Sequence, residues 1–193
     1  LILTAAWQEK HGDFAAAAGL NVLVGLALAF AFHRYRRELK ARDGFLLVTL
    51  VWVMMSAAAS VPLMMAIPGL SFTDAYFEAM SGLTTTGSTV LTGLDALPPS
   101  VNLWRSALHW FGGLGIIVLA VAVLPLLGVG GMQVYKAESP GPVKDEKLTP
   151  RITQTAKALW LVYTGITAAG AIALHAAGMT WLDAICHAFS AIG

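Results

Sequence analysis

Charge is scarce in this sequence: only 12% of its 193 residues are Asp, Glu, Lys or Arg, whereas 57% are hydrophobic and the mean hydropathy is +0.70. Soluble domains carry about 25% charged residues, so this composition excludes an ordinary soluble protein and predicts an integral membrane protein. Cysteine is nearly absent too, and the single Cys186 excludes an intrachain disulfide framework. No secretory signal pattern opens the chain. Because it begins at Leu1 rather than Met and stops within a repeated pattern, we expect a fragment of a longer protein.

Long apolar runs are plentiful. A bilayer span needs about 20 mostly apolar residues. Two shorter apolar runs, 72–83 and 181–192, each follow a long run and a glycine-containing turn, which favours re-entrant half-helices over interfacial helices. The runs long enough to cross the membrane are residues 14–32, 44–67, 106–127 and 158–177.

The basic residues are distributed unevenly between the connections. Five of the twelve lie between the first two predicted spans and five lie between the third and fourth, which leaves only Lys10 and Arg105 for the other side. By the positive-inside rule the side with ten basic residues is cytoplasmic. The two short apolar runs, and the threonine-rich stretch that follows the first, therefore belong to the external half.

An internal repeat relates the two short runs. With an offset of 109 residues, "SFTDAYFEAMSGL" aligns with "TWLDAICHAFSAI". Both copies begin with a capping pattern, Ser71 to Asp74 and Thr180 to Asp183, in which the hydroxyl satisfies backbone donors that lipid cannot satisfy. We interpret both aspartates as helix caps rather than ion ligands.

The stretch "GLTTTGST" follows the first short run. Its glycine spacing is that of a phosphate-binding loop, but no lysine follows Gly87, which excludes that motif. A non-helical backbone at membrane depth can instead present carbonyl oxygens to a dehydrated cation. The preceding helix directs its partially negative C-terminal end at the same point. Since residues 84–87 include no carboxylate, the pattern favours a monovalent cation.

Three other features carry two interpretations each. Glu78 is either an ion-pathway residue or a group hydrogen-bonded behind the threonine run. The small residues of "WFGGLG", 110–115, permit either a bend or close helix packing. Asp183 and His187 have the spacing of a metal pair but lack a third ligand. An enzyme that used the histidines is disfavoured, because they lie on different segments and no nucleophile pattern accompanies them.

The unit "DAYFEAMSGLTTTGST", followed by "TGLDALP", "HWFGGLGIIVLAVAVLPLLGVGGMQ" and "ESPGPVKDEKLTPRI", resembles the bacterial Trk/Ktr/HKT superfamily of potassium transporters, in particular its TrkH-type members. The resemblance implies an all-α polytopic membrane protein in which four helix–pore-helix–helix repeats surround one pore with pseudo-fourfold symmetry. About one and a half repeats would be present, and residues 1–7 would be the tail of an earlier span. The implied division is 1–43, extra spans and a basic loop; 44–135, the first repeat; 136–151, a cytoplasmic loop; and 152–193, the second repeat, cut at its filter.

The same resemblance implies potassium uptake across the bacterial inner membrane. K⁺ would be the transported ion, bound by backbone carbonyls of Thr85 and Thr86 with Thr84 and Gly87 beside them, and no organic cofactor or enzymatic activity is expected. The implied partners are a second copy of the protein, a cytosolic TrkA-like nucleotide-binding ring near residues 137–150, and the bilayer, but no nucleic acid. Symport and channel-like conduction both stay open. The alternatives are a Na⁺/K⁺ co-transporter or mixed monovalent cation transporter, and a non-transporting assembly subunit.

Overall fold

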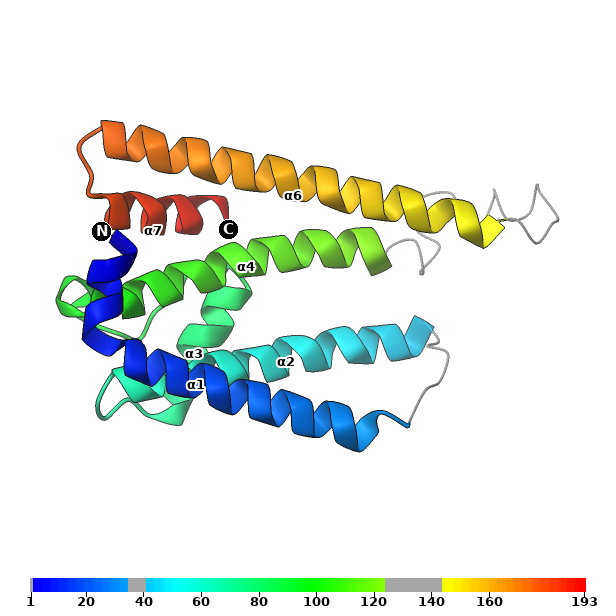
Figure 1. Cartoon of the computed structure of the whole chain (residues 1–193), viewed down its shortest axis with the longest axis horizontal. Coiled ribbons are helices and arrows are strands. Elements are labelled where there is room, and N and C mark those ends of the chain that lie inside the picture. Colours follow the sequence, from blue (N-terminus) through cyan, green and yellow to red (C-terminus); the bar gives the residue numbers. More distant parts are fainter. Residues whose placement is uncertain (1, 35–40, 124–143) are drawn as a thin grey trace.

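The computed structural model describes residues 2–34, 41–123 and 144–193, and within them every regular element is helical, as predicted (Figure 1). The long helices run roughly side by side, and the two short ones end part-way along them (Figure 1). In chain order the elements are α1 Ile2–Phe32, α2 Ala41–Ala66, α3 Phe72–Leu83, the 3₁₀ turn η1 Leu94–Ala96, α4 Pro99–Val123, α6 Lys144–Ala176 and α7 Trp181–Ile192.

Three of these helices contain segments long and apolar enough to cross a membrane: Gly12–Phe32, Phe45–Ala66 and Gln154–Ala176. Only 6% of the most apolar window of α1 is buried, an exposure that suits lipid and not water. These segments confirm three of the four predicted spans. The fourth prediction, 106–127, falls on α4 as far as Val123, and its last four residues lie outside the described part.

The start of α1 lies before the first predicted span. Residues 2–7 belong to the same helix as residues 14–32; that they form the tail of an earlier span stays a prediction. A single glycine, Gly12, lies between the two predicted segments, and its helical cost of about 1 kcal/mol does not end a long helix.

Helix α6 begins at Lys144, inside the predicted cytoplasmic loop 136–151. Pro150 favoured a loop, but the lysine, glutamate, leucine and glutamine residues around it are good helix formers. The 33 residues of α6 give it a length of about 50 Å, compared with about 30 Å of hydrocarbon. Its first turns therefore extend beyond the apolar segment, and the loop prediction is wrong from residue 144 onward.

The short helices α3 and α7 have the predicted bounds and are 12 residues long in both copies. Each follows a glycine with positive φ, Gly69 at +81° and Gly178 at +106°. The Ser71 hydroxyl accepts from the Asp74 amide at 3.1 Å and donates to its carboxylate at 2.7 Å, and Thr180 repeats both bonds with Asp183 at 3.2 and 2.6 Å. The predicted repeat is therefore a structural repeat.

Small side chains let α3 pack closely between α2 and α4. One buried cluster, at the C-terminal half of α3, contains Ala59, Ala79, Leu83 and Leu108. A second, at its N-terminal half, contains Leu63, Ala66, Ala75 and Val101. In the other copy α7 packs between α4 and α6, so α4 contacts both short helices (Figure 1).

We expect Ser71→Ala to lower the free energy of unfolding by about 1 kcal/mol, because it removes the cap of α3. Ser100→Ala is the matched control, since the buried Ser100 hydroxyl has no hydrogen-bond partner among the described residues and its loss costs nothing. The measurement is the thermal unfolding midpoint of each variant in detergent. Equal midpoints for the two variants would show that the cap contributes no stability.

Candidate functional site

The threonine segment, residues 84–87, begins where α3 ends, and its backbone is unusual. Thr84 caps the helix with φ −81° and ψ 4°. Thr85 has φ +55°, the only positive φ of a non-glycine residue in the described chain, and Gly87 has φ +76°. A β-branched residue in this region is strained, at a cost of about 1–3 kcal/mol. Such a conformation persists only where the surroundings hold it.

Ser81 supplies much of that hold from the last turn of α3. Its carbonyl oxygen accepts from the Thr86 amide at 2.9 Å and from the Gly87 amide at 3.4 Å. Its hydroxyl donates to the Ser88 carbonyl at 2.7 Å. The Thr85 amide is bonded as well, to the Gly82 carbonyl at 2.9 Å. The N–H groups of the segment are thus turned toward the helix.

The carbonyl oxygens of the segment differ from its N–H groups. Within the described residues, none of those from Thr84 to Gly87 accepts a hydrogen bond. Thr84, Thr86 and Gly87 are exposed, and the Thr84 and Thr86 hydroxyls contact each other at 2.8 Å. Unpaired carbonyls at membrane depth need a polar partner. The segment therefore has carbonyl oxygens that are available as ligands next to the negative end of α3.

Helix α4 fixes where the short helices end. A Cβ placed on Gly112 would lie 2.1 Å from the Leu83 carbonyl oxygen. A Cβ on Gly113 would lie 3.0 Å from Gly193, the counterpart of Thr84 in the repeat. Adjacent glycines therefore receive the ends of α3 and α7. Of the two interpretations of "WFGGLG", close packing is confirmed, and α4 runs through this stretch without interruption.

Glu78 lies behind the segment, on the same side of α3 as Ser81, and is 4% exposed. One carboxylate oxygen accepts from the Thr89 hydroxyl at 2.6 Å and from the Val90 amide at 2.7 Å. The other accepts from Arg105 Nε at 2.9 Å. The packed interpretation of Glu78 is thus the one that the structure supports.

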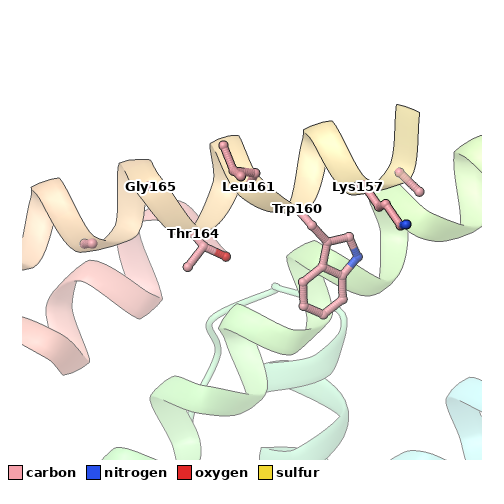
Figure 2. A pocket seen from close by; sticks show the side chains of 7 residues that line it. Lys157, Trp160, Leu161, Thr164 and Gly165 are labelled. Atoms are coloured by element: carbon pink, nitrogen blue, oxygen red, sulfur yellow. The ribbon is translucent and has the colours of Figure 1, made fainter. Parts of the chain in front are cut away.

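The remaining candidates do not form a site. Asp183 is bonded to Thr180, the N-cap of α7, and His175 stacks on Trp181 with ring centroids 3.8 Å apart. No group of three or more potential metal-ligating side chains occurs in the described ranges, so His187 and Asp183 lack the third ligand that the sequence also lacks. An open apolar hollow lies along α6 (Figure 2), and none of its lining residues belongs to the threonine segment: Ala156, Lys157, Trp160, Leu161, Thr164, Gly165 and Ala168.

Two residues of the site were not expected from the sequence. Ser81 and Arg105 both bond to the backbone or side chains that hold the threonine segment. For Ser81 the available signal was its presence in both copies of the repeat, with Ser190 as its counterpart. For Arg105 it was the isolation of a basic residue on the external side of a membrane protein.

Comparison with known proteins gives a consistent set of relatives. The family model TrkH, described as a cation transport protein, matches residues 10–193. The chain is 58% identical over 164 residues to the Trk system potassium uptake protein TrkH of Vibrio parahaemolyticus, a match that covers 84% of this chain and 34% of that protein. It is 51% identical over 187 residues to the protein of the same name from Halomonas elongata, a match that covers 96% of this chain and 38% of that protein.

The fold matches a solved structure as well. The crystal structure of the potassium transporter TrkH from Vibrio parahaemolyticus superposes with a TM-score of 0.73 at 46% identity, over 92% of this chain and 35% of that one. The chain thus spans between 34% and 38% of the length of these relatives.

Proposed function

The chain belongs to the TrkH family of cation transport proteins, and we propose that it supplies the first part of a pore through which the whole protein takes up potassium. The chain is part of a multi-pass protein of the bacterial inner membrane, and its family is one of transporters. Relatives named as potassium uptake proteins support the choice of ion. We propose no enzymatic activity.

The threonine segment is the proposed selectivity filter. The observation that carries this proposal is that the carbonyl oxygens at the end of α3 accept no hydrogen bond from the described residues, while the N–H groups of Thr85, Thr86 and Gly87 are bonded to α3. The carbonyls of Thr85 and Thr86 would bind K⁺, with those of Thr84 and Gly87 beside them. Backbone carbonyls can replace the water shell of K⁺, and the C-terminal end of α3 adds negative potential. K⁺ is the transported ion, and no organic cofactor is needed on this chain.

The proposed architecture rests on the repeat of α3 and α7. Residues 44–135 would form the first quarter of a pseudo-fourfold pore, and the second quarter would begin in α6 and reach its filter after Gly193. Since α6 starts at Lys144, the second repeat takes in part of the stretch predicted to be a loop. Residues 1–43 would precede the first repeat.

The proposed partners are a second copy of the protein and a cytosolic TrkA-like nucleotide-binding ring. The name "Trk system" that the relatives carry supports a system of several components. The ring would approach the cytoplasmic side, where the connection between α4 and α6 lies; residues 137–143 of the predicted contact are outside the described part.

Complementation tests the function. The intact gene should restore growth of a potassium-uptake-deficient bacterium at low external K⁺. Thr85→Gly should reach the membrane in normal amounts but lower the preference for K⁺ over Na⁺ by about tenfold, about 1.4 kcal/mol, because glycine releases the strained backbone and loosens its carbonyls. The measurement is the ratio of K⁺ to Na⁺ uptake in cells.

Thr92→Gly is the matched control, an exposed threonine further along the external loop whose replacement should leave the ratio unchanged. Equal K⁺ and Na⁺ uptake by the unmodified protein would favour the mixed cation transporter. Surface expression without rescue would favour an assembly subunit. An unchanged ratio in Thr85→Gly would make the filter assignment wrong.

A further inference from the structure

The buried side of α3 carries two polar anchors one turn apart. Ser81 and Glu78 are 6% and 4% exposed, and their i, i+3 spacing puts them on one face of the helix. Ser81 bonds to the threonine segment itself and to Ser88. Glu78 bonds to the next three residues, 89–91, which we call the exit segment. Ser81 therefore holds residues 86–88 of the loop, and Glu78 holds residues 89–91.

Both oxygens of the Glu78 carboxylate act as acceptors. Oε1 accepts from the Thr89 hydroxyl at 2.6 Å, the Val90 amide at 2.7 Å and the Leu91 amide at 3.4 Å. Oε2 accepts from Arg105 Nε at 2.9 Å. The carboxylate thereby joins α3, the exit segment and α4. Because all of its partners are donors, no neutral side chain of the same shape can replace it.

We propose that Glu78 and Arg105 form a positioning pair that fixes the outer edge of the selectivity filter and thereby contributes to the preference for K⁺. This inference rests on the proposed function, because the pair acts on selectivity only if residues 84–87 are the filter. Ser81 holds the inner end of the loop and the pair holds the outer end. The carbonyls between the two anchors then have little freedom to turn away from the ion.

The charge of the pair suits this role. A lone buried carboxylate so close to the filter would be costly and would add a fixed negative charge, whereas a carboxylate beside a guanidinium is balanced. The Arg105 side chain is 18% exposed, and the paired carboxylate is 2% exposed. The pair therefore positions the backbone through hydrogen bonds while adding no net charge to the pore wall.

The repeat shows that the outer anchor is specific to the first copy. An offset of 109 residues places Ser190 at the position of Ser81, so the inner anchor is present twice. The same offset places His187 at the position of Glu78. A neutral imidazole has one acceptor nitrogen and cannot serve donors on two sides. The first quarter of the pore thus has a fixed outer edge that the second copy cannot build with the same chemistry.

Glu78→Gln in the intact gene is the main test. The amide keeps the shape of the carboxylate but offers one acceptor and one donor group, so either Arg105 or the exit segment meets a donor instead of an acceptor. We expect the preference for K⁺ over Na⁺ to fall by about tenfold, a change typical of a few lost hydrogen bonds. The readout is the ratio of K⁺ to Na⁺ uptake, measured for a variant that purifies as a monodisperse protein. A general loss of folded protein lowers both uptakes and leaves this ratio unchanged.

Two further variants keep the test decisive. Thr89→Val removes the hydroxyl that donates to Glu78 at 2.6 Å and accepts from the Leu91 amide at 3.1 Å, but it leaves the ion pair, so the ratio should fall in the same direction by about twofold. This variant decides the matter if Glu78→Gln does not fold. Asn102→Ala, the control, removes a bond on α4 from Asn102 to the Leu94 carbonyl at 2.8 Å and should leave the ratio unchanged.

The outcomes separate the two proposals. If Thr85→Gly changes the ratio and folded Glu78→Gln does not, the positioning pair is refuted while the filter stands. If neither changes it, the filter assignment itself fails. If Asn102→Ala changes the ratio as much as Glu78→Gln, the effect belongs to general loosening of α4 and the inference is overturned.

Discussion

Gly112→Ala is expected to abolish potassium uptake and to lower the free energy of unfolding by about 3 kcal/mol. The added Cβ would lie 2.1 Å from the Leu83 carbonyl oxygen, closer than real Cβ contacts come. The obstacle is backbone, which cannot rotate away as a flexible side chain can, so α3 or α4 must shift. Because Leu83 is the last residue of α3, that shift moves the start of the threonine segment. Uptake in cells and the thermal midpoint of the purified protein measure the two effects.

Gly115→Ala is the matched control on the same helix. There the new Cβ would meet only the Trp52 ring, at 3.5 Å, which is an ordinary contact. Helix propensity favours the change, since alanine is about 1 kcal/mol better than glycine in a helix interior. Uptake and stability should therefore be retained. Loss of function in both variants would show that α4 tolerates alanine at neither glycine, and loss in neither would contradict the close packing against Leu83.

Gly87→Ala is expected to reduce the preference for K⁺ over Na⁺ by tenfold or more, about 1.4 kcal/mol. Space is not the difficulty, because the added Cβ would lie 3.7 Å from the nearest atom, His109 Cε1. The difficulty is φ +76°, which costs an alanine about 1–2 kcal/mol. The backbone can relieve this cost by rotating the adjacent peptide planes, which turns the carbonyls of Thr86 and Gly87. The K⁺ to Na⁺ uptake ratio reports that rotation.

Gly69→Ala separates backbone strain from filter geometry. Gly69 has φ +81°, and nothing lies within 4 Å of an added Cβ, so its backbone cost matches that of Gly87. It precedes α3, away from the threonine segment. We expect the two variants to lose similar thermal stability, with the uptake ratio changed only for Gly87→Ala. A similar change in ratio for both would place the origin of selectivity outside residues 84–87.

The bounds of the short helices could be predicted from the sequence because local signals agree there. Ser71 and Thr180 mark the starts, a glycine precedes each, and the 109-residue offset supports both. The long spans were predictable for another reason, because apolar length alone decides whether a segment can cross a membrane. The start of α6 was missed because Pro150 suggested a break where the surrounding helix formers prevail.

The anchors of the threonine segment could not be predicted in the same way. Glu78 and Arg105 are 27 residues apart, and nothing local in the sequence pairs them. Thr85 adopts a positive φ that threonine disfavours on its own. That conformation depends on hydrogen bonds to Gly82 and Ser81, which exist only once the chain has folded back onto α3.

The convergence of α3 and α7 on adjacent glycines of α4 has a consequence for how the protein can change over time. One helical turn serves as the common wall of two quarters of the proposed pore, with Gly112 against Leu83 and Gly113 against Gly193. A residue change on one side of that turn alters the fit on the other, so substitutions in the two quarters should be non-additive. The two quarters must therefore evolve together, although their sequences are separated by more than a hundred residues.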